Sequence, residues 1–163
     1  MVTLRAFEPA HKEALCNYTL PEAQRDFTAL PALVFERIAA RNQAGDFLAM
    51  PVTILFQGAP VGFFVLDSGS DKFVYSDNPQ SLLLRSLSVD ERQQGQGIGT
   101  MAMRLLPDFV KENYPIDSIT EIALGVNVNN VAAYNLYLKV GCKDEGKQIE
   151  GPHGMQYVLT LQI

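Results

Sequence analysis

Three glycines at alternating positions form the most chemically suggestive segment of the sequence, Gln94-Gly95-Gln96-Gly97-Ile98-Gly99. An apolar stretch typical of a strand precedes them, and an amphipathic stretch typical of a helix follows. Glycine tolerates positive φ angles and lets a bound group approach the backbone closely. The first turn of a helix adds unpaired N–H groups and the positive end of the helix dipole, which together favour a phosphate. The segment therefore predicts an anion-binding turn, with a tight turn that binds nothing as the alternative.

Two common phosphate-binding motifs do not fit this turn. A P-loop ends in Gly-Lys-Ser/Thr, whereas Gly99 is followed by Thr100 and Met101. A Rossmann fingerprint, Gly-x-Gly-x-x-Gly, matches at Gly95 and Gly97 but has Thr100 in place of its third glycine. The turn also comes late in the chain, with too little sequence after it for a doubly wound sheet.

A second chemically suggestive residue is Tyr137, because a phenol can give a proton to a leaving group. Asn129 or Asn130 can cap a helix that reaches about Val140, and Gly141 suits a left-handed C-terminal cap. Periodicity alone favours a Tyr137 ring that fills the core, so the chemical role needs further support.

Hydrophobic periodicity and turn residues predict the elements that position these two segments. We expect a hairpin turn at Gly58-Ala59-Pro60, a polar loop with some strand content over Ser68 to Asn78, and an irregular connection over Leu20 to Pro31. Pro107 lies inside the helix after the glycine turn and costs about 3 kcal/mol there, so we expect a kink or an early end. Strands are expected at about 3–7, 52–56, 61–66, 81–89, 119–126, 142–149 and 155–162, and the other helices at about 9–18, 32–42 (ending near Gly45) and 129–140.

The order of these elements is β-α-α-β-β-β-α-β-α-β-β. The strand–helix–strand segment requires residues 81–89 and 119–126 to run parallel, and the hairpins make the other pairs antiparallel. We therefore expect a single domain over residues 1–163 of the α/β class (α+β type). Its central sheet is mixed and mostly antiparallel, with about seven strands, one parallel pair and about four flanking helices.

Two motifs of this sequence resemble the GNAT superfamily of N-acetyltransferases. Gln94-x-x-Gly97-x-Gly99 matches the family's acetyl-CoA loop, Gln/Arg-x-x-Gly-x-Gly/Ala, and Leu87-Ser88-Val89-Asp90 resembles the end of the strand before it. Asn130-x-x-Ala133-x-x-Leu136-Tyr137-x-x-x-Gly141 resembles a second signature downstream. The resemblance is close from about Leu82 to Cys142 and rests on element order before that. One departure is Cys142, where the family usually has Phe, a position that mostly packs.

The resemblance implies the acyl-CoA N-acyltransferase fold and transfer of an acetyl group from acetyl-CoA to a primary amine of a small molecule or peptide, by direct attack in a ternary complex. The alternative is a non-catalytic acyl-CoA-binding module of the same fold. By resemblance, a backbone N–H near Leu87 to Val89 stabilises the oxyanion, and Tyr137 is the general acid. The implied cofactor-binding residues are Leu87, Ser88, Val89, Gln94, Gly95, Gln96, Gly97, Ile98, Gly99, Thr100 and Asn130.

The sequence identifies the general base and the acceptor site less clearly than the cofactor site. Arg85 interrupts an apolar run, so it could line the acceptor site or be a paired charge. By resemblance, the segment Tyr18 to Leu30 covers the acceptor groove, where Glu22, Gln24, Asp26 and Phe27 could meet a cationic amine. Candidate bases are Asp67, Asp71, Asp77 and Glu121, with a water chain as the alternative.

Composition limits the kinds of molecule that the protein is expected to bind. A formal net charge of −5 disfavours nucleic acid and weakly favours a cationic small molecule. The distant pair Cys16 and Cys142, with His11 and His153, has no metal-ligand spacing, so we expect no metal. No apolar run reaches the roughly 20 residues that span a bilayer, and the N-terminus lacks a signal-peptide pattern. We expect a cytoplasmic protein without membrane contact, and the resemblance adds a homodimer.

Overall fold

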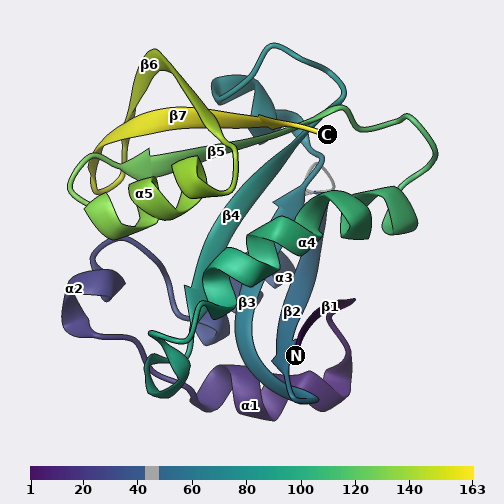
Figure 1. The fold of residues 1–163 in the computed structure, drawn as a ribbon, viewed down its shortest axis with the longest axis vertical. Coiled ribbons are helices and arrows are strands. Elements are labelled where there is room, and N and C mark those ends of the chain that lie inside the picture. The colour runs from purple at the N-terminus through teal and green to yellow at the C-terminus, as the bar shows by residue number, and fades with distance from the viewer. Residues whose placement is uncertain (43–47) are drawn as a thin grey trace.

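The protein is built on one twisted sheet of seven strands, in the order β1-β2-β3-β4-β5-β7-β6 (Figure 1). The computed structural model describes residues 1–42 and 48–163, so the predicted helix end near Gly45 lies outside the described residues. β4 and β5 pair in parallel, and every other pair in the sheet is antiparallel, as predicted. The strands are β1 (Val2–Ala6), β2 (Ala49–Phe56), β3 (Ala59–Asp67), β4 (Ser81–Val89), β5 (Glu121–Asn127), β6 (Lys143–Gly151) and β7 (Gly154–Gln162).

Helices cover both faces of this sheet (Figure 1). α4 and α5 lie on one face, where the larger apolar core joins them to the even-numbered residues of β5. α1 and α3 lie on the other face, over a smaller core that includes Phe63 and Val65 of β3. The α-helices are α1 (Lys12–Asn17), α2 (Glu22–Arg25), α3 (Pro31–Asn42), α4 (Ile98–Asn113) and α5 (Val131–Lys139), and 3-10 turns span Pro9–His11, Ser70–Val74 and Glu91–Gln93.

Two connections differ from their prediction. The described part of the chain has five α-helices rather than about four, because the single turn α2 forms within the stretch expected to be irregular. The polar segment between β3 and β4 contains a 3-10 turn and no strand in the described residues, so the strand content expected there is wrong. Short polar stretches carry little periodicity, which is why neither turn could be recognised.

The first hairpin turns earlier than predicted. Gln57 and Gly58 have φ angles of 52° and 81°, so they form the two-residue turn that fits the twist of antiparallel strands. Ala59 and Pro60, expected in the turn, instead begin β3 and pair with the last two residues of β2. The closing hairpin is likewise tighter than predicted, because β6 and β7 extend to Gly151 and Gly154.

Helix α4 does not end early at Pro107 but continues to Asn113. The residues beyond the proline supply the reason, since Phe109 and Val110 are buried in the larger core. Burying two such side chains stabilises the helix by about 3–6 kcal/mol, which offsets the roughly 3 kcal/mol cost of the proline.

Candidate active site

The backbone edge of β4 is open over the second half of the strand. β4 pairs with β5 only at Ser81–Leu83, opposite Glu121–Ala123. Beyond these pairs the two strands splay apart (Figure 1). Unpaired N–H and C=O groups on a strand edge can pair with an extended ligand. The splay therefore leaves a row of backbone groups on β4 between the two halves of the sheet.

A β-bulge in β4 marks the start of this open edge. Phe63 pairs with Ser88 and Val65 with Arg85, so one residue of β3 stands opposite Ser86 and Leu87 of β4. Ser86 has a φ of 60°, in the left-handed region that costs strain outside glycine. The bulge thus bends the strand at the point where it leaves β5.

Hydrogen bonds at the end of β4 fix the direction of its backbone groups. The Asp90 N–H donates to Val61 O on β3 at 2.8 Å. Because backbone groups alternate along a strand, the N–H and C=O of Val89 and Leu87 point to the opposite edge, toward the gap beside β5. The Val89 carbonyl accepts a bond of 2.8 Å there from the Gln94 side chain. The N–H of Leu87 thereby lies on the open edge.

The glycine turn leads from this edge into α4. Gly95 and Gly97 have φ angles of 81° and 77°, and no atom lies within 4 Å of a Cβ built on either one. Glycine is therefore required at both positions by the backbone conformation rather than by packing. Among the described residues, no hydrogen bond is recorded for the N–H groups of residues 95–100, whereas the Met101 N–H donates to Gly97 O. A row of amide donors therefore opens at the positive end of a 16-residue helix.

The side chains of the turn serve to hold it. Gln94 exchanges two hydrogen bonds of 2.9 Å with Gln24 of α2, in addition to its bond to the end of β4. Gln96 donates to the backbone and side chain of Gln93. Ile98 is buried in the larger core, so its side chain cannot reach a ligand. These residues can contribute backbone amides to a site, while their side chains position the turn.

Helix α5 packs directly beside this turn. A Cβ built on Gly99 would lie 3.2 Å from a methyl carbon of Leu136, so glycine allows the close approach of α4 and α5. Asn130 caps α5, as predicted, by accepting from the Ala133 N–H at 3.3 Å. Gly141 follows the helix with a φ of 104°, in the left-handed conformation predicted for its end.

Tyr137 combines a buried ring with an accessible hydroxyl. Its side chain belongs to the larger core and is only 8% exposed. The hydroxyl has no hydrogen-bond partner in the described residues, yet Ser81 Oγ is the one side-chain atom there that is both sealed from solvent and unpaired. The hydroxyl therefore keeps some contact with solvent. Burial raises the pKa of Tyr137 above its ordinary value, so the group remains a proton donor.

Cys142 packs against this helix. It is 7% exposed and donates its backbone N–H to Tyr137 O at 3.0 Å. Burial raises the pKa of the thiol to about 11. A thiol with this pKa is protonated at neutral pH, so Cys142 fills the core as a small apolar side chain.

An open strand edge, an amide-lined turn and an unpaired tyrosine therefore meet between β4, α4 and α5. A family model described as "Acetyltransferase (GNAT) family" matches residues 9–142. The chain belongs to this family. The predicted family is thus confirmed, and with it, at the level of the family, the class of acetyl-CoA-dependent N-acetyltransferases.

Individual relatives agree with this assignment. The chain is 37% identical, over 159 residues, to the protein of Bacillus subtilis (strain 168) named uncharacterized N-acetyltransferase YbbJ, and the match covers 97% of this chain and 95% of the relative. Solved structures confirm the fold. Aminoglycoside acetyltransferase AAC(6')-Ib in complex with coenzyme A and kanamycin has a TM-score of 0.78 at 19% identity, covering 99% of this chain and 95% of the other. Spermidine N-acetyltransferase from Vibrio cholerae, with CoA and spermine, has a TM-score of 0.69 at 17% identity, with the same coverage.

Two of the four candidate bases of this GNAT chain are held by arginine. Asp67 is fully buried and accepts from Arg85 at 3.2 Å and from the Gly69 N–H at 2.8 Å. Asp71 accepts from Arg41 and Arg85, and the hydrogen bond from Arg41 is the main reason why its pKa lies below the ordinary value. The lowered pKa means that Asp71 takes up a proton poorly.

The other two candidate bases lie elsewhere. Glu121, at the start of β5, accepts hydrogen bonds from the side chains of Ser76 and Gln162. Asp77 is exposed on the segment before β4. The structure thus favours none of the four as the general base, and a water chain stays open as the alternative.

The segment Tyr18 to Leu30 lies against β4 and the glycine turn. Tyr18 is buried, and its hydroxyl hydrogen-bonds to Ser88 Oγ at 2.5 Å. Burial raises the pKa of this phenol well above its ordinary value. Gln24 is engaged with the turn, whereas Glu22 and Asp26 are exposed and Phe27 is half-buried. This segment therefore helps to hold the end of β4 and the glycine turn in place.

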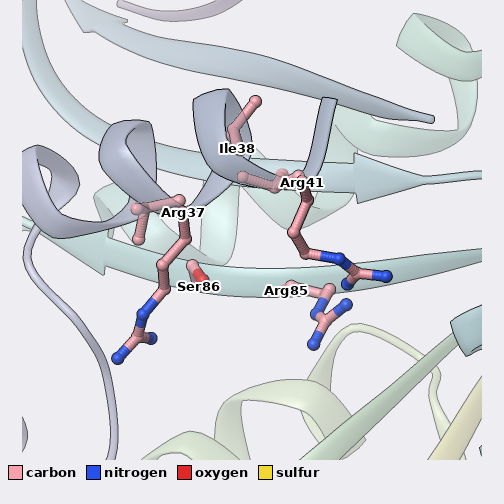
Figure 2. Close-up of a pocket in the computed structure, with 7 residues that line it drawn as sticks. Arg37, Ile38, Arg41, Arg85 and Ser86 are labelled. Atoms are coloured by element: carbon pink, nitrogen blue, oxygen red, sulfur yellow. The ribbon is translucent and has the colours of Figure 1, made fainter. Parts of the chain in front are cut away.

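Sequence reasoning missed two arginines near the site. Arg37 and Arg41 of α3 lie over the bulge of β4, where Arg85 and Ser86 are found (Figure 2). They escaped notice because they occupy one polar stripe of an ordinary amphipathic helix. The polar residue Ser86 inside an apolar strand was the available signal for the bulge.

In the described chain, no helix is long and apolar enough to cross a bilayer.

Proposed function

We propose that this protein transfers the acetyl group of acetyl-CoA to a primary amine of a small molecule or peptide, by direct attack in a ternary complex. The observation that carries the proposal is the meeting of the open edge of β4 with the amide-lined turn at the start of α4. An extended chain that ends in phosphates needs both features, a strand edge for its amides and helix N–H groups for its anionic end.

Acetyl-CoA supplies an acyl group activated as a thioester. The residues available to hold it fit its chemistry, because the two glycines with positive φ leave open space where a Cβ would stand, and a bound group can approach their backbone closely. In the proposal, the N–H groups of residues 95–100 bind the pyrophosphate. The free backbone groups of Leu87 to Val89 bind the pantetheine arm. The Asn130 amide NH2 is also available, since its oxygen alone is used in the helix cap.

The reaction needs a donor for the oxygen that becomes negative and a proton for the departing sulfur. The Leu87 N–H lies on the open edge just after the bulge and is the proposed donor. Tyr137 holds a proton at its Oη, and burial keeps that proton in place at neutral pH. The acceptor amine must lose its own proton first, because an alkylammonium has a pKa near 10.4. Water is the proposed route for that proton, since Asp67 and Asp71 are held by arginine.

The fold neighbours give the acceptor class its support. Two of them are complexes that hold kanamycin or spermine beside coenzyme A, and both compounds carry primary amines. A cationic acceptor, suggested by the net charge of −5, is one form of this proposal. The predicted homodimer is a separate proposal, which light scattering can test.

The experiment is to mix the purified protein with acetyl-CoA and a panel of amino acids, polyamines, aminoglycosides and peptides, and to follow the release of free thiol. We expect saturable thiol release with at least one amine, and an N-acetylated product by mass spectrometry. Tight acetyl-CoA binding without thiol release across the panel would favour the non-catalytic acyl-CoA-binding module. Absence of acetyl-CoA binding would refute both readings.

A further inference from the structure

A cationic cavity lies beside the bulge of β4. It has a volume of about 100 Å³ and is rimmed by Arg37 and Arg41 of α3 and by Arg85 and Ser86 of β4, over an apolar floor that includes Ile38 and Val65. Figure 2 shows the guanidinium groups of Arg41 and Arg85 close together, with Arg37 reaching past Ser86 on the other side. The cavity is therefore flanked by positive charge at both ends.

Carboxylates hold two of the rim arginines, and Arg37 stands apart from them among the described residues. Arg41 and Arg85 share one oxygen of Asp71, and Arg85 also donates to Asp67. These bonds hold the two guanidinium groups in place. Arg37 has no ion pair or hydrogen bond with any residue in the described part of the chain. Arg37 is thus an exposed cation with no carboxylate partner among the described residues.

The position of the cavity ties it to the site of transfer. Ser86, on its rim, is the bulge residue, and the next residue is the first with backbone groups on the open edge of β4. Arg85 pairs with Val65, so its side chain lies on the α3 face of the sheet. The proposed cofactor-binding helices α4 and α5 lie on the opposite face. A compound in the cavity therefore approaches the open edge from the side that the cofactor leaves free.

We propose that the acceptor is an amine that also carries an anionic group, a carboxylate or a phosphate, which the arginine rim of this cavity binds. This inference rests on the proposed acetyl transfer and narrows its substrate. Guanidinium groups bind carboxylate and phosphate oxygens through paired, charge-assisted hydrogen bonds. The same rim repels a polyamine, since like charges placed together oppose binding. The local charge thus opposes the attraction for cations suggested by the net charge of the whole chain.

The test compares acceptors that differ only in the anionic group. L-amino acids are paired with their carboxamides, and O-phosphoethanolamine with ethanolamine, while spermidine and kanamycin represent cationic acceptors. Thiol release from acetyl-CoA gives kcat/KM for each compound. We expect the anionic member of at least one pair to exceed its neutral partner by about tenfold, the effect of one charge-assisted contact. The amino acid and phosphate arms show which anion is used.

Arg37→Gln is the informative variant, because Arg37 has no partner within the described fold whose loss would disturb folding. It should raise KM for the anionic acceptor about tenfold, leave kcat and the neutral partner unchanged, and leave the Kd of acetyl-CoA unchanged. Arg104→Gln, an exposed arginine on α4, is the matched control and should change none of these values. A conservative Arg37→Lys should restore part of the preference.

Two results would overturn the inference while acetyl transfer stands. One is a wild-type preference for spermidine or for neutral amines, and the other is an equal loss of neutral and anionic activity in Arg37→Gln. If no acceptor gives thiol release, binding of the same acceptors to the complex of the protein with CoA is measured by calorimetry. Binding of anionic amines that Arg37→Gln abolishes would support the cavity and count against the proposed function. Absence of such binding would overturn the inference.

Discussion

Replacing Tyr137 with phenylalanine is the sharpest test of the proposed chemistry, because it removes one oxygen and keeps the ring. The hydroxyl has no hydrogen-bond partner in the described residues, and the ring belongs to the larger core. The substitution leaves no donor unpaired and creates no cavity, so the free energy of unfolding should change by less than about 1 kcal/mol. Folding and chemistry can therefore be separated at this residue.

The expected loss of turnover follows from the acidity of the leaving group. General acids contribute about 10²- to 10⁴-fold, and a departing thiol has an ordinary pKa near 8.5, so it needs the proton less than an alkoxide would. We expect kcat to fall about 100-fold, or about 2.7 kcal/mol, with the Kd of acetyl-CoA within about twofold of wild type. Because burial raises the pKa of Tyr137 above 10, wild-type kcat should show no loss from its ionisation up to about pH 9.

The assay is single-turnover thiol release, with the Kd of acetyl-CoA measured separately by calorimetry. Tyr134→Phe is the matched control, since Tyr134 lies on the same helix and its hydroxyl bonds to Asp144 instead of facing the site. A Tyr137→Phe variant with unchanged kcat would remove the general-acid role. Equal losses of kcat in the two variants would indicate a structural effect of the helix, and would refute the separation argued above.

Three further substitutions test the groups around the site. Arg85→Gln leaves the buried carboxylate of Asp67 without its cation and should lower the free energy of unfolding by about 2–3 kcal/mol in urea titrations, and adding Asp67→Asn should restore at least half of the loss. Asp71→Asn should lower the free energy of unfolding by at most about 1 kcal/mol at pH 7. The difference from wild type should shrink as pH falls below about 4. The arginine hydrogen bonds lower the pKa of the Asp71 carboxyl, so the carboxylate stabilises the fold above its unfolded pKa and loses that effect on protonation. An equal difference at pH 3 and pH 7 would contradict this linkage. Gly97→Ala should lower the free energy of unfolding by about 1–2 kcal/mol and weaken acetyl-CoA binding. Gly146 on β6 has a similar positive φ and open surroundings, so Gly146→Ala should lower stability as much in thermal unfolding and leave the Kd of acetyl-CoA unchanged.

The glycine turn and the capped helix were predictable because each is a local arrangement. Gly95 and Gly97 need positive φ angles, and Asn130 and Gly141 mark the two ends of one helix. Such signals lie within a few residues of the structure that they determine. The parallel pair of β4 and β5 and the antiparallel hairpins followed from the same local elements, since short connections leave few ways to join them.

The cavity could not be predicted, because its parts come together only through the packing of α3 on the sheet. Arg37 and Arg41 are one turn apart on that helix, but nothing in the chain near them indicates Arg85 as a neighbour. The burial of Asp67 could not be predicted either. It ends an apolar strand, where a sequence pattern suggests an exposed charge, and it is fully buried against Arg85. Long-range charge pairing carries no periodic signal that a single sequence displays.

The bulge in β4 explains why one strand can serve both sides of the sheet. Before it, Leu82 and Leu84 face the core under α4 and α5, whereas after it Leu87 and Val89 do so. The extra residue thus shifts the alternation by one, since a strand has a period of two. In a strand of the same length without the bulge, the backbone groups of residues 87 and 89 would turn toward β3, and the open edge would lose its donor. Ser86→Val, which disfavours the left-handed backbone conformation of the bulge, should therefore lower thiol release even if the chain still folds, and a Ser86→Val variant with unchanged turnover would show that the open edge is not where transfer occurs.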